Sequence, residues 1–204
     1  MSDSLAQTLA SRPTLPRSCF VLRHGQSEAN VQGLIASSPE IAVTSYGLTK
    51  EGREQVKRSL AKHRDQLSDV RQIYCSDFRR TRETAQLAAQ ILEVPVQQTP
   101  ELRERFFGDW DGQSDDNYQG VWAADAQDPK HKKWRVESVS EVAQRMKGFV
   151  ASLDTLDPEQ ACLLVSHGDP LQILITALLD GDLRRHRELE PLQTAEVRCL
   201  ARES

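Results

Sequence analysis

Residues 19–30 of this 204-residue chain read CFVLRHGQSEAN, in which four consecutive apolar residues run directly into an arginine and a histidine. A short, unbroken apolar run is typical of a strand that is buried on both faces of a sheet. In open α/β sheets, ligands bind beyond the carboxyl ends of such strands. The sequence therefore places Arg23 and His24 where a ligand site would form, and Gly25 would let the backbone approach that ligand closely.

The same arrangement occurs a second time in the C-terminal part of the chain. Residues 161–170 read ACLLVSHGDP, another apolar run that leads into a histidine and a glycine, with Pro170 suited to the first turn of a helix. If the two strands are adjacent and parallel, His24 and His167 lie side by side, one available as a nucleophile and one to stabilise charge. The N-terminal amides of the helix at Pro170 would also face an anion.

The alternation of apolar runs with segments of helical spacing sets the fold class. We predict strands at 19–22, 73–75, 162–165 and 197–200, and helices at 50–67, 79–92, 138–153 and 171–179. This order predicts an α/β protein, a three-layer α/β/α sandwich with a mostly parallel central sheet. We expect a flexible N-terminal segment over residues 1–17 and a single domain over residues 18–204, with a lid-like excursion at about residues 112–135.

Composition excludes several classes of protein. A net charge of −4 argues against nucleic acid as the main partner, because binding to a phosphate backbone relies on a surplus of Lys and Arg. No apolar stretch approaches the roughly 18–20 residues that span a bilayer, and the N-terminus has no secretory pattern, so no membrane partner is expected. Cys19, Cys75, Cys162 and Cys199 are far apart and lie in apolar runs. We therefore expect buried thiols and a cytoplasmic location.

Five motifs, in order along the chain, carry a resemblance to a known family. They are LRHGQSEAN at 22–30, LTKEGREQ at 48–55, SDFRRTRETA at 76–85, LRERFFGDWDG at 102–112 and SHG at 166–168. With these motifs the chain resembles the short, phosphatase-type members of the histidine phosphatase superfamily, the RHG-motif proteins related to phosphoglycerate mutase. The resemblance covers roughly residues 20–175 and implies a phosphoglycerate mutase-like fold.

The resemblance also implies a role for each residue at a motif position. His24 would be the nucleophile that forms a phosphohistidine, and Glu104 would protonate the leaving oxygen. The phosphoryl group would be held by cations, a second histidine and small polar groups: Arg23, Arg80, His167, Ser27, Asn30, Gln26 and Gly168. Because Arg and His supply the positive charge, we expect neither a metal ion nor a cofactor.

These roles favour a metal-independent phosphoric monoester hydrolase of the histidine acid phosphatase type, acting on a small phosphorylated metabolite. The alternative is a cofactor-dependent phosphoglycerate mutase. The stretch between Glu104 and His167 is shorter than in the mutases that the chain resembles, which favours hydrolysis. A non-catalytic module that binds phospho-ligands is less favoured, because the nucleophile and the acid are both present. The sequence is also compatible with a homodimer.

Two groups of polar residues allow more than one interpretation. The basic run Lys130–Arg135 is either a solvated surface or an electropositive rim that attracts a second phosphate or carboxylate of the substrate. His63, His131 and His186 lie among polar or basic neighbours, so we expect all three to be exposed to solvent.

Overall fold

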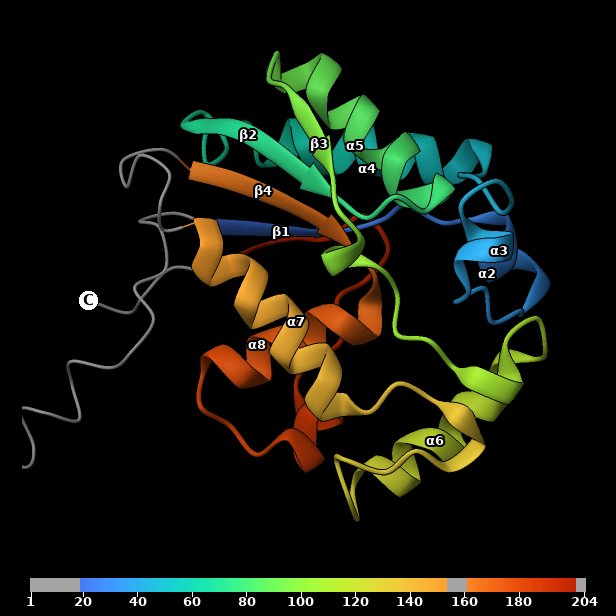
Figure 1. The fold of residues 1–204 in the computed structure, drawn as a ribbon. Helices are drawn as coiled ribbons and strands as arrows, with labels where there is room; N and C mark the ends of the chain where they lie inside the picture. Colours follow the sequence, from blue (N-terminus) through green and yellow to red (C-terminus); the bar gives the residue numbers. More distant parts are fainter. Residues whose placement is uncertain (1–18, 154–160, 201–204) are drawn as a thin grey trace, which may run out of the picture.

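The computed structural model describes residues 19–153 and 161–200, so the segment expected to be flexible, residues 1–17, lies outside the described residues (Figure 1). The strands of the described part are β1 (Cys19–Arg23), β2 (Val70–Cys75), β3 (Val96–Gln98), β4 (Ala161–Ser166) and β5 (Val197–Cys199). They form one sheet in the order β3-β2-β4-β1-β5. Only the β1–β5 pairing within it is antiparallel. The predicted α/β class with a mostly parallel sheet is confirmed.

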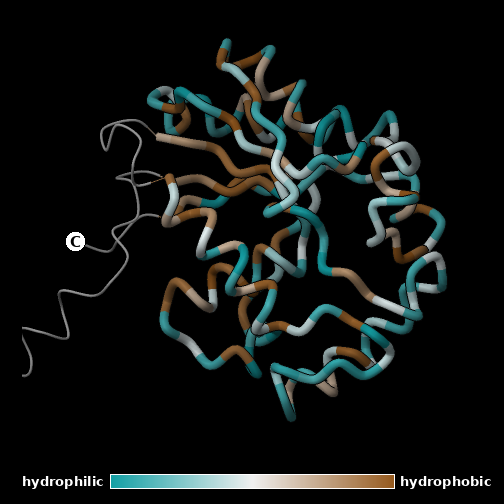
Figure 2. The backbone as a smooth tube through the Cα atoms, viewed as in Figure 1, coloured by the Kyte–Doolittle hydropathy of each residue, from teal (hydrophilic) through white to brown (hydrophobic). Residues whose placement is uncertain are grey.

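Helices cover both faces of this sheet (Figure 1). The helices α4 (Lys50–Lys62) and α5 (Arg79–Leu92) lie on one face, and α7 (Val139–Ser152) and α8 (Gly168–Leu178) lie on the other. Side chains of β1 alternate between the two interfaces: Val21 packs with the α7 and α8 residues, whereas Leu22 packs with those of α4 and α5. Each fully buried aliphatic side chain contributes roughly 1.5–3 kcal/mol. The hydrophobic strands at the centre of Figure 2 therefore account for the continuous apolar runs of the sequence.

Short elements gather beyond the carboxyl ends of the parallel strands (Figure 1). They are α2 (Glu28–Gln32), α3 (Pro39–Ala42), α6 (Tyr118–Asp125), η1 (Pro100–Leu102), η2 (Gly108–Trp110), η3 (Asp115–Asn117), η4 (Lys133–Arg135) and η6 (Leu183–Glu188). The expected excursion at residues 112–135 contains η3, α6 and η4. Val121 of this excursion and Val136, which directly follows it, pack with Ile35 and Phe107 in a separate small apolar cluster.

The predicted helices differ from the observed ones mainly at their ends. The helix at 79–92 is correct, but the one predicted at 50–67 ends at Lys62, and Leu67 reaches the core from the turn that follows. The helix α7 begins directly after Ser138, whose hydroxyl and Glu141 form a capping box. The helix α8 begins at Gly168, so the predicted start at residue 171 is three residues late. No helix of the described residues has the length and apolar character of a membrane span.

One observed strand has no counterpart among the predicted ones, and one expectation about the cysteines is wrong. The strand β3 was not predicted, because all three of its residues are exposed and no apolar run marks it. Cys199 is exposed on β5, whereas Cys19, Cys75 and Cys162 are buried as expected. The strand β5 has only three residues and lies at the edge of the sheet, where one side of the backbone has no neighbouring strand. A cysteine in an apolar run is therefore not buried by that run alone.

Two glycines bring the start of α4 against the loop that follows β1. A Cβ atom at Gly52 would lie 2.0 Å from the backbone oxygen of Gln26, and one at Gly25 would lie 2.4 Å from the backbone oxygen of Gly52. Neither position can accept a side chain without displacing backbone. This contact between two motifs fixes the loop that carries His24.

Candidate active site

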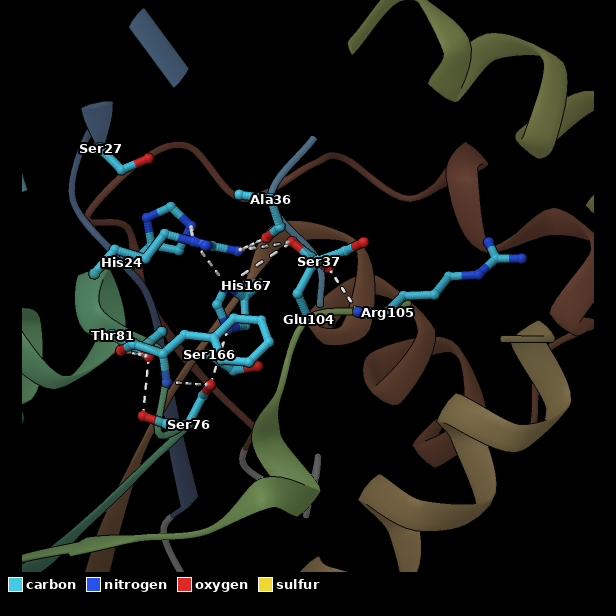
Figure 3. A network of polar contacts seen from close by, with 12 residues as sticks. His24, Ser27, Ala36, Ser37, Ser76, Thr81, Glu104, Arg105, Ser166 and His167 are labelled. Atoms are coloured by element: carbon cyan, nitrogen blue, oxygen red, sulfur yellow. Dashed lines mark hydrogen bonds and ion pairs between the residues drawn. The ribbon is translucent and has the colours of Figure 1, made fainter. Parts of the chain in front are cut away.

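Four side chains from separate segments converge beyond the carboxyl ends of three adjacent strands. His24 follows β1, His167 follows β4, and Arg80 lies in the first turn of α5 after β2. Glu104 lies on the segment after η1 and faces the two histidines (Figure 3). The centroids of the two imidazole rings are 5.2 Å apart. The order β2-β4-β1 therefore assembles residues that are 24 to 143 positions apart in sequence.

His24 is held as a neutral imidazole with one tautomer. Its Nε2 atom lies 3.1 Å from Nε of Arg80, and its Nδ1 atom lies 2.7 Å from the backbone oxygen of Gly25. Because the guanidinium can only donate, Nε2 must accept and Nδ1 must carry the proton. Burial lowers the pKa of His24 well below its usual value, and the charges of Arg80 and Arg23 lower it further. The result is an unprotonated Nε2 that can act as a nucleophile.

His167 is oriented from both sides of its ring. Nδ1 accepts a hydrogen bond from Nε of Arg80 at 3.2 Å, and Nε2 donates to the hydroxyl of Ser76 at 3.1 Å. Burial, followed by the charge of Arg80, holds the pKa of His167 well below its usual value. Ser76 was not selected from the sequence as a site residue, although its position directly after the apolar run of β2 is a signal that could have identified it.

The two motif arginines offer unpaired donors at the same place. Arg80 donates from Nη2 to the backbone oxygen of Ala36 at 2.9 Å, and Arg23 donates from Nη1 to that of Leu192 at 2.7 Å. Within the described residues, Nη1 of Arg80 and Nε of Arg23 are buried without a hydrogen-bond partner. A buried donor that lacks a partner costs about 1–3 kcal/mol. Such donors indicate a site built for an anion.

Glu104 lies beside these cations but is not tightly paired with them. Its Oε2 atom is 3.8 Å from Nδ1 of His167 and 3.9 Å from Nη2 of Arg80, while Oε1 accepts the backbone N–H of Arg105 at 3.0 Å. Burial raises the pKa of Glu104 to about 7, and the charge of Asp169 adds to this effect, whereas Arg80 opposes it. The carboxyl group can therefore hold or release a proton near neutral pH.

The remaining sequence-selected residues divide into two sets. Ser27, Asn30 and Gly168 line the same cavity as His24. Ser27 and Asn30 also form the capping box of α2, which fixes their side chains. Gln26 does not line the cavity: its Oε1 atom accepts a hydrogen bond from the hydroxyl of Thr49 at 2.8 Å. Its side chain positions the start of α4 instead of facing the site.

The cavity measures about 230 Å³ and has two walls that the motifs do not supply. One wall comes from the excursion and contains Tyr118 and Trp122, and the other comes from the segment after α8 and contains Arg187 and Leu192. The basic run 130–135 does not line this cavity. In that run, Lys132 pairs with Glu141 and Arg135 pairs with Asp109, each at an exposed position. Lys132 and Arg135 line a second, open cavity that also contains Glu104, so both interpretations of the run stay predictions.

The expectation that three further histidines are exposed is wrong for two of them. His131 is buried, with Nε2 2.8 Å from Asp125, and Asp125 also forms two bonds of 2.7 and 2.8 Å with the fully buried guanidinium of Arg105. His186 is completely buried, and its Nε2 atom lies 3.4 Å from Oδ1 of Asp169. His63 is half-buried. Basic neighbours in the sequence gave no signal of these carboxylates.

Comparisons with known proteins agree with the motifs. Residues 19–204 match the sequence model of the histidine phosphatase superfamily (branch 1). An adenosylcobalamin/alpha-ribazole phosphatase of Salmonella typhimurium is 30% identical over 167 residues, which cover 78% of each chain. A probable phosphoglycerate mutase of Photorhabdus laumondii is 28% identical over 175 residues, covering 83% of this chain and 78% of the relative. The solved structure of a mycobacterial glucosyl-3-phosphoglycerate phosphatase with VO3 superposes with a TM-score of 0.77 at 26% identity, covering 91% of this chain and 92% of that one.

Proposed function

The chain belongs to the histidine phosphatase superfamily, and from this membership and the site geometry we propose that it is a metal-independent phosphomonoesterase that acts through a phosphohistidine on a small phosphorylated metabolite. One observation supports this above all others. Two buried guanidinium N–H groups, on Arg23 and Arg80, have no partner among the described residues, and they belong to the two arginines whose charges lower the pKa of His24. A phosphoryl dianion would satisfy both donors while its phosphorus atom faces Nε2.

In the first step, Nε2 of His24 attacks phosphorus and the bond between phosphorus and the ester oxygen breaks. Glu104 is protonated before this step and gives its proton to the departing oxygen, so that an alcohol leaves rather than an alkoxide. Arg23, Arg80 and His167 stabilise the charge on the phosphoryl oxygens. The bound dianion would itself raise the pKa of the nearby Glu104 carboxyl and so favour its acid form.

In the second step, water attacks the phosphohistidine on phosphorus. The Glu104 carboxylate takes a proton from this water, the phosphorus–nitrogen bond breaks, and inorganic phosphate leaves with His24 neutral again. The electron pair of the broken bond returns to Nε2. Arginine and histidine supply all of the positive charge in this scheme, so it needs neither a metal ion nor a cofactor.

The size of the cavity bears on the substrate class. A volume of about 230 Å³ lies below the 300–1,000 Å³ range of pockets that enclose drug-sized ligands. The phosphoryl group occupies part of it, which leaves room for a leaving group of a few carbon atoms. Glu104 also lines a second, open cavity of about 1210 Å³, so this size limit applies to the part of the leaving group next to the phosphoryl group.

The experiment is rapid quench of the enzyme with a ³²P-labelled phosphomonoester chosen from a panel of phosphorylated metabolites. We expect protein-bound phosphate that is labile in acid and stable in base in the wild type, and none in His24→Ala. Label on an aspartate or a serine would contradict the assigned nucleophile. Interconversion of 3-phosphoglycerate and 2-phosphoglycerate that depends on a bisphosphoglycerate primer and exceeds phosphate release would assign the chain to the mutases instead.

A further inference from the structure

We propose that Arg187 determines substrate specificity by binding a carboxylate on the leaving group, so that the preferred substrates are small phosphomonoesters of hydroxy acids. This inference rests on the proposed phosphomonoesterase function and names a substrate class for it. Arg187 lies outside the five motifs, in η6 after the last helix of the chain.

The position of Arg187 is the first argument. It lines the cavity that contains His24, on the wall formed by the segment after α8. The same segment is attached to the phosphate site, because Leu192 accepts a hydrogen bond from Arg23 at 2.7 Å. Burial lowers the pKa of Arg23, and the positive charge of Arg187 is among the causes that lower it further, as expected for two cations that share one cavity. Arg187 therefore lines the same cavity as Arg23 and His24 but lies outside the motifs that would hold the phosphoryl group.

The second argument is that the guanidinium is fixed in place by its neighbours. Its Cζ atom lies 3.8 Å from the ring centroid of Trp122, and that ring stacks on Tyr118 at an interplanar angle of 11°. Nη1 donates to Oε1 of Gln172 and lies 3.4 Å from Oδ1 of Asp169. Asp169 also accepts the indole N–H of Trp122 at 3.1 Å. Because stacking and hydrogen bonds hold the guanidinium plane, little entropy remains to be lost when it binds a ligand.

The third argument concerns the N–H groups of Arg187 that make no hydrogen bond to the protein. Within the described residues, every hydrogen bond and ion pair of Arg187 uses Nη1, so Nε and Nη2 have no protein acceptor. These two N–H groups form the fork that matches the two oxygens of a planar carboxylate. The side chain is 29% exposed, which leaves it accessible to a ligand in the cavity.

The acidic neighbour Asp169 does not cancel this site. Its Oδ2 atom lies 3.4 Å from the guanidinium of the fully buried Arg105, and its Oδ1 atom lies 3.4 Å from His186. Burial raises the pKa of Asp169, but His186, Arg105 and Arg187 together lower it below its usual value. Asp169 is thus shared among several partners and holds Arg187 through one nitrogen only.

The test uses two substrates that differ in a single group. In 3-phosphoglycerate a carboxylate stands where glycerol 3-phosphate has a hydroxymethyl group, and both fit a small cavity. We expect the wild type to favour 3-phosphoglycerate by roughly 10- to 100-fold in kcat/KM, the usual effect of hydrogen bonds to a charged group. In Arg187→Gln this ratio should fall toward one, mainly through a higher KM for 3-phosphoglycerate. Arg187→Lys keeps the cation and should retain more of the preference than Arg187→Gln.

The matched control is Arg184→Gln, which removes a cation three positions earlier that pairs with Asp182 at the exposed surface and does not line the cavity. The ratio of its kcat/KM for 3-phosphoglycerate to that for glycerol 3-phosphate should equal that of the wild type. The inference is overturned if the wild type shows no preference for the carboxylate, or if Arg187→Gln lowers kcat/KM equally for both substrates, as loss of a purely structural contact would do. A folded wild type that releases phosphate from neither compound, nor from p-nitrophenyl phosphate, would instead contradict the proposed function itself.

Discussion

Arg80 donates the hydrogen of its Nε atom to Nε2 of His24 at 3.1 Å, so the guanidinium occupies the lone pair that the proposed reaction uses. The same N–H lies 3.2 Å from Nδ1 of His167 and is shared between the two rings. A bound phosphoryl group would draw the guanidinium onto its oxygens and release Nε2 for attack. In the proposed mechanism, Arg80 would thus fix the tautomer of His24 before substrate binds and stabilise the phosphoryl anion afterwards.

Replacement of Arg80 by lysine should lower kcat/KM by roughly 10²–10³-fold, the usual effect of removing a donor that stabilises a transition state. A lysine keeps the charge but cannot bond two imidazoles and an oxyanion in one plane. Steady-state kinetics with p-nitrophenyl phosphate measures this effect. Arg79→Lys is the control, because Arg79 pairs with Glu83 on the outer side of α5. Equal losses in the two variants would show that Arg80 has no special role.

Replacement of Glu104 by glutamine should lower kcat by roughly 10²–10⁴-fold for an ester with an alkoxide leaving group. The loss should be smaller with p-nitrophenyl phosphate, because that leaving group is stable as an anion and departs without a proton. The measurement compares both substrates in both enzymes. If the two substrates lose activity by the same factor, the proton comes from another group, and Asp115 and Asp169, which also line the cavity, are the next candidates.

The pH dependence of kcat/KM should follow the two buried groups. The pKa of Glu104 is raised to about 7, so its acid form, and with it the activity on alkoxide esters, declines as pH rises through about 7. The pKa of His24 is lowered, so the nucleophile stays unprotonated as pH falls through the ordinary histidine range. A full pH profile of Glu104→Gln should lack the decline near pH 7. Persistence of that decline would assign it to another group.

Activity should survive prolonged treatment with EDTA. Across residues 19–153 and 161–200, no three His, Cys, Asp or Glu side chains are arranged to hold a metal ion. The scheme for phosphoryl transfer also uses arginines where many enzymes use magnesium. Phosphate release is measured before and after chelation, with dialysis against metal-free buffer as the control. Loss of turnover that one divalent ion restores would contradict the prediction.

Replacement of Asp125 by asparagine should lower the free energy of unfolding by about 3–5 kcal/mol, because it leaves the buried guanidinium of Arg105 without its main counter-charge. Urea unfolding followed by circular dichroism measures this change. Glu188→Gln removes an exposed partner of Arg185 and should have little effect. Similar urea midpoints for the two variants would mean that the buried pair of Arg105 and Asp125 contributes no more to stability than a surface pair.

The strands β1 and β4 could be predicted because each is an apolar run buried on both faces, and a candidate site residue lies at or just after its carboxyl end. This reasoning identified β1, β4 and the position of His24 relative to His167. It failed for β3, which has no buried residue. It also failed for Cys199, which is exposed at the edge of the sheet and not buried as expected. Both strands lie at an edge of the sheet, and the local sequence does not show whether a strand pairs on one side or on both.

The site was predicted in part for the same reason. The motifs identified the side chains of the candidate site. They did not identify the acceptors of Arg80 and Arg23, because these are the backbone oxygens of Ala36 and Leu192, and every residue type has such an oxygen. No motif marks Arg187, yet it lines the cavity and contacts Trp122 and Gln172 from other segments. Contacts between distant segments determine which residues line the cavity, and a single sequence does not show these contacts.

The pairing of β1 with β4 sets Cys19 opposite Cys162, 143 positions later in the chain. During synthesis, the strand that precedes His24 is therefore made early, and its neighbouring strand is made only when most of the protein exists. No N-terminal fragment that stops before β4 can contain both imidazoles. Formation of such long-range parallel pairs is slow compared with that of local helices. Recovery of phosphatase activity during refolding should accordingly lag behind the return of helical signal and report the closure of the central sheet.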